Sequence, residues 1–109
     1  MAHLSTSDGV GIEFFQFIEP ATRVPDNTFE YWRAGIFHFC LTAVDIEATA
    51  QRIADHGGKV LSKVWPLYGN KDYKAVYCQD PWGTIVELCS RPYEQFWSNL
   101  APAPTPYGE

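Results

Sequence analysis

A pattern with a glycine at its first position and a glutamate at its fifth occurs twice in this chain of 109 residues. It reads GVGIEFF at residues 9–15 and GTIVELC at residues 83–89, a spacing of 74 residues. In each copy the glutamate, Glu13 or Glu87, lies in an apolar, strand-like run. An ionised carboxylate is costly there unless a cation or a hydrogen-bond donor meets it. The repetition of this cost predicts a repeated structural unit in which both glutamates have a function.

The second copy closes a longer series of predicted elements. The residue patterns predict strand, helix, strand, strand and strand, at residues 36–42, between Asp45 and Gly57, and at 59–67, 73–79 and 84–90. Asp45 is a predicted helix N-cap, and the two glycines at 57 and 58 are a predicted helix stop. The second unit is therefore expected to run from about residue 36 to residue 92.

The first copy is preceded by only one further strand. Residues 2–6 and 9–19 read as two strands joined by an Asp-Gly turn. The second of these strands has apolar side chains on both faces, which predicts a strand buried on both sides. The chain therefore reads as one and a half copies of the unit.

The predicted organisation is one domain at residues 1–100, followed by a flexible tail. It consists of a partial first unit, a linker, a complete second unit and a terminal helix, at residues 1–19, 20–35, 36–92 and 93–100. Residues 101–109 are rich in proline and are expected to be poorly ordered.

Composition excludes several classes of partner. The net charge is −5 and the eight Lys and Arg residues are scattered, which argues against a nucleic-acid or anionic membrane surface. No segment approaches the roughly 18 apolar residues of a membrane span, and the N-terminus does not resemble a signal peptide. We therefore expect a cytoplasmic protein with a small-molecule ligand. The three cysteines form no Cys-x-x-Cys pair and are expected to behave as small hydrophobes in strands.

Two residues of the second unit indicate a metal site. His38 and Glu87 are each a lone hydrophilic residue in a core-like strand, and Glu13 is the equivalent of Glu87 in the partial copy. Imidazole and carboxylate ligands suit Zn, Ni, Mn, Co or Fe ions. The alternative for the histidine is an ordinary interior side chain with its hydrogen bonds satisfied.

The same residues resemble a known family. The histidine strand, the helix ending at the two glycines, and the segment YCQDPWGTIVEL at 77–88 resemble the second module of the vicinal oxygen chelate superfamily. This superfamily includes glyoxalase I, extradiol dioxygenases and the bleomycin- and fosfomycin-resistance proteins. Residues 1–19 resemble the last two strands of its first module. The resemblance implies an α+β fold in which βαβββ modules form a cupped mixed sheet around a divalent cation.

The resemblance also implies roles for individual residues. His38, Glu87 and Glu13 correspond to metal ligands, and the two glutamates are the candidate catalytic residues, with Glu13 as the candidate base. In the enzymes of the superfamily the metal holds two adjacent substrate oxygens as a Lewis acid. An active protein would then be a lyase of the lactoylglutathione type or a dioxygenase-like enzyme. The chain departs from the family pattern because it lacks the first strand, the helix and the next strand of the first module.

Two other functions remain open from the sequence. The first is a binding protein without catalysis, of the bleomycin-resistance kind, whose ligand pocket is lined by Phe15, Phe17, Cys40, Trp65, Tyr77 and Trp82. The second is an inactive dimeric remnant. All of these hypotheses predict a homodimer, because the missing strand leaves sheet edges unpaired. Either each half unit is completed by the partner, or two full units face each other so that two copies of His38 and Glu87 form one site.

Overall fold

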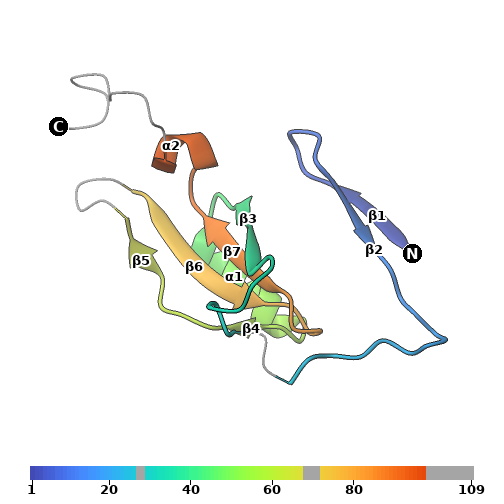
Figure 1. The fold of residues 1–109 in the computed structure, drawn as a ribbon. Coiled ribbons are helices and arrows are strands. Elements are labelled where there is room, and N and C mark those ends of the chain that lie inside the picture. The colour runs from blue at the N-terminus through green and yellow to red at the C-terminus, as the bar shows by residue number, and fades with distance from the viewer. Residues whose placement is uncertain (27–28, 68–71, 98–109) are drawn as a thin grey trace.

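The computed structural model describes residues 1–26, 29–67 and 72–97 (Figure 1). Its elements are β1 (Ala2–Ser5), β2 (Gly11–Phe14), β3 (His38–Thr42), α1 (Ile46–Asp55), β4 (Lys59–Val60), β5 (Trp65–Pro66), β6 (Lys74–Gln79), β7 (Ile85–Cys89) and α2 (Tyr93–Trp97). The predicted tail at 101–109 and the last residues of the predicted terminal helix lie outside the described residues. Neither described helix combines the length and the apolar character that a membrane span requires.

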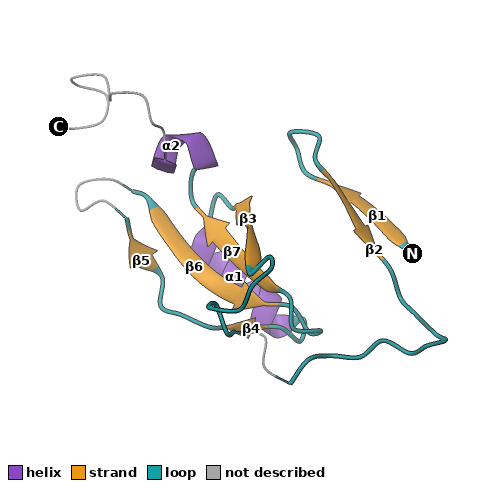
Figure 2. Ribbon diagram, in the orientation of Figure 1, coloured by secondary structure: helices purple, strands orange, loops and turns teal. Residues whose placement is uncertain are grey.

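The second unit forms a mixed five-stranded sheet in the order β3-β7-β6-β4, with β5 also paired to β6 (Figure 2). Strands β3 and β7 are parallel, and the other pairs are antiparallel. A parallel pair needs a crossover connection, which here contains α1 and the strands β4, β5 and β6. This confirms the predicted α+β fold and the order of strand, helix and strands, except that the single strand predicted at 59–67 is present as two short strands, β4 and β5.

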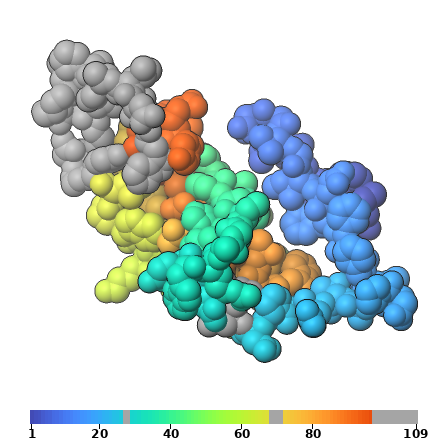
Figure 3. Space-filling model, viewed as in Figure 1, coloured from blue at the N-terminus to red at the C-terminus, as the bar shows by residue number. Residues whose placement is uncertain are grey.

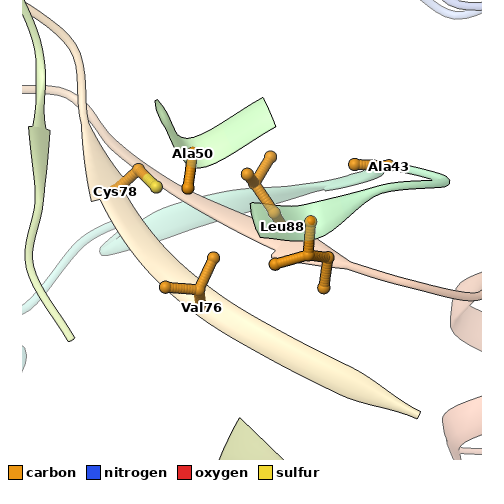
Figure 4. Packing of buried hydrophobic residues seen from close by; sticks show 6 residues of the cluster. Ala43, Ala50, Val76, Cys78 and Leu88 are labelled. Carbon is orange, nitrogen blue, oxygen red and sulfur yellow. The ribbon is translucent and has the colours of Figure 1, made fainter. Parts of the chain in front are cut away.

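Alternation along the strands gives the sheet two different faces. One face packs against α1, and its buried core consists of Ala43, Ile46, Ala50, Val76, Cys78 and Leu88 (Figure 4). On the opposite face, Cys40 of β3 and Tyr77 of β6 both lie opposite Glu87 of β7 in the strand register. The helix therefore closes the apolar face and leaves the polar face available for a site.

The ends of α1 follow from its sequence. The Asp45 side chain accepts a hydrogen bond from the backbone N–H of Ala48 at 3.0 Å, as an N-cap does. Gly57 has φ of 91°, the left-handed conformation that ends a helix and that glycine adopts without strain. Both predicted helix signals are confirmed.

The short helix α2 packs against the polar face of the sheet near one end. Phe96 is buried in a small cluster with Ala75 and Cys89. The sequence also predicts that this terminal helix places Phe96 and Trp97 on a neighbouring surface. The contact of Phe96 is observed, and the side chain of Trp97 lies outside the described part of the structure.

The hairpin of β1 and β2 stands apart from the sheet (Figure 3). Among the elements of the described residues, β1 and β2 make extensive contacts only with each other. The radius of gyration is 16.2 Å, against about 13 Å for a compact chain of this length. The predicted hairpin is confirmed.

The prediction that the second hairpin strand is buried on both sides is wrong. β2 ends at Phe14, and beyond it Phe15, Phe17 and Ile18 are 56%, 59% and 84% exposed. This segment does have apolar side chains on both faces, but their burial requires a surface that packs against the strand. Within the described residues of one chain, no other sheet packs against this hairpin.

The packing of the core predicts that truncating the two aliphatic residues on either side of the N-cap Asp45 lowers the free energy of unfolding by clearly different amounts. Ile46 is 1% exposed and Val44 is 95% exposed. Ile46→Ala should lower the free energy of unfolding by about 2–5 kcal/mol, because it leaves a cavity beneath the helix. Val44→Ala should change it by no more than about 0.5 kcal/mol. Urea denaturation of both variants measures this, and equal losses would contradict the observed packing.

Candidate functional site

The polar face of the sheet brings together His38, the first residue of β3, and Glu87 in the middle of β7. His38 lies opposite Ile85 in the parallel register, so Glu87 is its diagonal neighbour on the same face. Nε2 of His38 is 3.2 Å from Oε1 of Glu87. The two side chains are 26% and 18% exposed, so water screens this pair less than a surface ion pair.

One nitrogen of the His38 ring has no partner. Within the described part of the chain, its Nδ1 is buried and makes no hydrogen bond. A buried polar atom without a partner costs free energy, and in native proteins such an atom calls for an explanation. The ring is thus held by the glutamate at Nε2, whereas its Nδ1 faces no hydrogen-bonding group in the described residues.

Aromatic rings surround the histidine. The ring centroids of Phe37 and Tyr77 lie 4.9 Å and 5.1 Å from that of His38. Trp65 of β5 lies 5.4 Å from Tyr77, and Phe29 of the linker lies 5.8 Å from Tyr77. The site therefore has a polar floor and an apolar wall, and the linker supplies part of that wall.

Tyr77 is the one phenol in this wall that lies directly opposite Glu87. Burial raises the pKa of Tyr77 above its ordinary value, and the negative charge of Glu87 raises it further. The phenol is therefore neutral at physiological pH. It can donate a hydrogen bond to an oxygen of a bound molecule, but it is not a base under these conditions.

Two cysteines lie on the same face. The Sγ atoms of Cys40 and Cys89 are 3.1 Å apart, and both lie within 4.8 Å of a carboxylate oxygen of Glu87. Burial raises the pKa of both thiols above the ordinary value. The sequence predicts that all three cysteines are small apolar residues in strands, and that only Cys40 also lines the ligand pocket. A signal was present, since Cys40 follows His38 by two residues and Cys89 follows Glu87 by two.

The structure gathers five of the predicted site residues on this face and leaves four elsewhere. His38, Cys40, Trp65, Tyr77 and Glu87 are brought together. Glu13 lies on the hairpin, where its carboxylate is 3.6 Å from Nδ1 of His3 and both side chains are exposed. Phe15 and Phe17 stack on each other at 6.3 Å just beyond β2. Trp82 is 57% exposed on the turn between β6 and β7.

A groove of about 340 Å³ opens beside the histidine, between the linker and the first residues of β3 and β7. Its wall includes Glu30 and Arg33 of the linker, which form an ion pair at 3.8 Å, and Thr84 of the β6–β7 turn. Within the described residues, β3 pairs only with β7, so its outer edge has no strand beside it. The groove thus reaches His38 at the end of the sheet where β3 and β7 begin.

A comparison with family models decides the family. The model described as the Glyoxalase/Bleomycin resistance protein/Dioxygenase superfamily matches residues 1–88. The chain belongs to this superfamily. The match includes the hairpin, the linker and the sheet as far as Leu88, and it confirms the family that the sequence motifs resemble.

A solved structure supports the same conclusion. The crystal structure of a glyoxalase family protein from Bacillus cereus is similar, with a TM-score of 0.66 and 26% sequence identity. The similarity covers 80% of this chain and 58% of that chain, so the present chain spans little more than half of its length. No curated protein matches the sequence.

The burial of the thiols predicts their order of reaction. Cys78 and Cys89 are 0% and 4% exposed, whereas Cys40 is only partly buried. Burial also raises the pKa of Cys78, which lowers its thiolate fraction. Ellman's reagent should therefore modify one thiol per folded chain quickly. Cys40→Ser should abolish the fast phase and Cys78→Ser should leave it intact; three thiols of equal rate would contradict the structure.

Proposed function

We propose that this superfamily member binds a divalent metal ion at His38 and Glu87 and uses it to hold a small, oxygen-rich substrate. The contact of 3.2 Å between imidazole and carboxylate carries the proposal, together with the buried Nδ1 that has no partner in the described residues. Nitrogen and oxygen donors of this kind suit zinc, nickel, manganese, cobalt or iron. A bound ion would supply Lewis-acid polarisation of the substrate oxygens.

The residues of one chain fit such an ion only in part. His38 and Glu87 provide one nitrogen and one carboxylate, whereas catalytic zinc commonly has three protein ligands. Glu13, the third predicted ligand, lies on the exposed hairpin. A second copy of the chain that brought its Glu13 to this site would provide the missing ligand and the candidate base.

Other residues around the site would orient the substrate. The neutral hydroxyl of Tyr77 can donate to a substrate oxygen next to Glu87. Phe29 and Phe37, 5.5 Å apart, would exclude water from the open side of the histidine. Water exclusion strengthens every electrostatic interaction in the site.

A homodimer is part of the proposal. The exposed apolar side chains at the end of the hairpin and the free edge of β3 both need a protein surface to cover them. Either the hairpin completes the partner's cup and delivers Glu13, or two full units face each other and combine two copies of His38 and Glu87. Sedimentation of a mainly monomeric chain at micromolar concentration would contradict both arrangements.

A second candidate function is binding without catalysis. The rings of Phe29, Phe37, Trp65 and Tyr77 give the site an apolar wall that suits a flat ligand. In this alternative the metal-free protein binds aromatic compounds with unchanged affinity after His38 is replaced. An inactive dimeric remnant would bind neither metal nor ligand.

The first test measures metal content by plasma mass spectrometry after metal exchange. About one ion per chain or per dimer is expected in the native protein, and none in a His38→Ala, Glu87→Ala double variant. A His56→Ala, Glu94→Ala double variant is the matched control, because both side chains are exposed and outside the site. Absence of bound metal at micromolar excess would remove the metal-dependent function and leave the binding protein or the remnant.

The second test asks whether Glu13 acts in the partner's site. Neither a Glu13→Ala nor a His38→Ala homodimer should bind metal tightly. A refolded equimolar mixture should recover about a quarter of the native sites, because half of its closed dimers combine the two variants and each of these has one intact site. A mixture of His38→Ala with Glu87→Ala should recover none, since both residues belong to one chain's site. Tight metal binding by the Glu13→Ala homodimer would instead favour the arrangement in which two full units face each other, because that site does not use Glu13.

A further inference from the structure

Four side chains with metal-binding atoms lie on one face of two neighbouring strands. His38 and Cys40 belong to β3, and Glu87 and Cys89 belong to β7. Each pair is separated by two residues, so both members point to the same side of the sheet. The parallel register places Cys40 directly opposite Glu87, so His38 is diagonal to Glu87 and Cys89 is diagonal to Cys40. Glu87 is therefore between a nitrogen donor and two sulfur donors.

The sulfur side of this group comes near the dimensions of a metal site, in which a sulfur and an oxygen ligand lie about 3.5 Å apart. The Sγ atoms of Cys40 and Cys89 and a carboxylate oxygen of Glu87 lie within 4.8 Å of one another. A tetrahedral zinc ion with Zn–S bonds of about 2.3 Å holds two sulfurs about 3.8 Å apart. The observed separation of 3.1 Å has to open by only about 0.7 Å, which small rotations of the cysteine side chains provide.

We infer that Cys40, Glu87 and Cys89 form a site for a thiophilic divalent cation of the zinc or cadmium class. The inference rests on the proposed function, because it keeps the metal on Glu87, and it deepens that proposal by naming the class of ion and by replacing His38 with the two thiolates as the other ligands. His38 lies on the other side of the same carboxylate and holds it through the 3.2 Å contact. A histidine in this position orients a metal-binding carboxylate.

The donor set selects among the metals that imidazole and carboxylate alone would accept. Soft thiolates favour zinc, cadmium or copper(I), whereas manganese and magnesium favour oxygen ligands. Each cysteine loses its proton to solvent when it binds, so one ion releases two protons. Without a cation both thiols stay protonated, because burial disfavours two thiolates beside a carboxylate.

The third cysteine of the chain provides a matched control. Cys78 lies on β6 with its side chain in the core beneath α1, on the opposite face of the sheet. Its thiol is completely buried, and the cation site does not include it. A Cys78→Ala variant therefore removes one thiol per chain and leaves the proposed donor set unchanged.

The test is anaerobic titration of the full-length, reduced, metal-free protein with Co²⁺. The expected result is a near-ultraviolet sulfur-to-cobalt charge-transfer band that saturates with one ion per site and disappears when Zn²⁺ is added. Cys40→Ala should weaken binding by about a hundredfold or more, since even changes behind the ligands cost about 10–100-fold. Cys78→Ala should keep the band and the affinity, and Mn²⁺ should compete poorly.

Two results would overturn the inference in distinguishable ways. Stoichiometric Co²⁺ binding without a charge-transfer band would show that only nitrogen and oxygen donors hold the ion. This result would be consistent with the proposed function and would refute the thiol site. No Co²⁺ binding at all would overturn both. Cys40 is the variant of choice because it is only partly buried, and Cys89→Ala, which touches the buried cluster of Phe96, serves as the second variant once urea denaturation shows that it folds.

Discussion

The parallel pairing of β3 with β7 is the interaction on which both the core and the site depend. It places Leu41 opposite Leu88 on the helix-facing side and Cys40 opposite Glu87 on the other side. Because side chains alternate with a period of two, a shift of the register by one residue would send the apolar set to the polar face. The burial of Leu88 beneath α1 thus fixes the register, and the register fixes the distance between His38 and Glu87.

The same pairing leaves the sheet open on one side. β3 is at the edge of the described sheet, and the hairpin of β1 and β2 has no sheet in the described chain to pack against. Protein chains rarely leave both a free strand edge and a set of exposed phenylalanines uncovered in the assembled state. The proposed association of two chains would cover both the strand edge and these side chains.

Much of the second unit could be predicted from local patterns. The Asp45 cap and the glycine stop at Gly57 each predicted an end of α1, and the lone hydrophilic residues in apolar strands predicted that His38 and Glu87 lie on one face. The cysteine pair was missed because a thiol in a strand is usually a small hydrophobe, and only the register between two distant strands brings Cys40 and Cys89 together. The burial expected around Glu13 was wrong for a related reason. Apolar periodicity shows which side chains need to be covered, but whether they are covered depends on a surface that need not belong to the same chain.

The net charge of the ligands determines whether a bound metal ion is suited to Lewis-acid catalysis or only to cation binding. A divalent ion held by a neutral imidazole and one carboxylate keeps a net positive charge, which stabilises an oxygen that becomes negative during a reaction. Two thiolates and a carboxylate carry three negative charges against two positive ones, so the same ion attracts such an oxygen less strongly. Glu87 belongs to both donor sets, and Cys40 lies directly opposite it. The sulfur atoms would therefore shift this site from Lewis-acid catalysis towards the binding or storage of a cation, while the imidazole of His38 and a carboxylate from a second chain would shift it back.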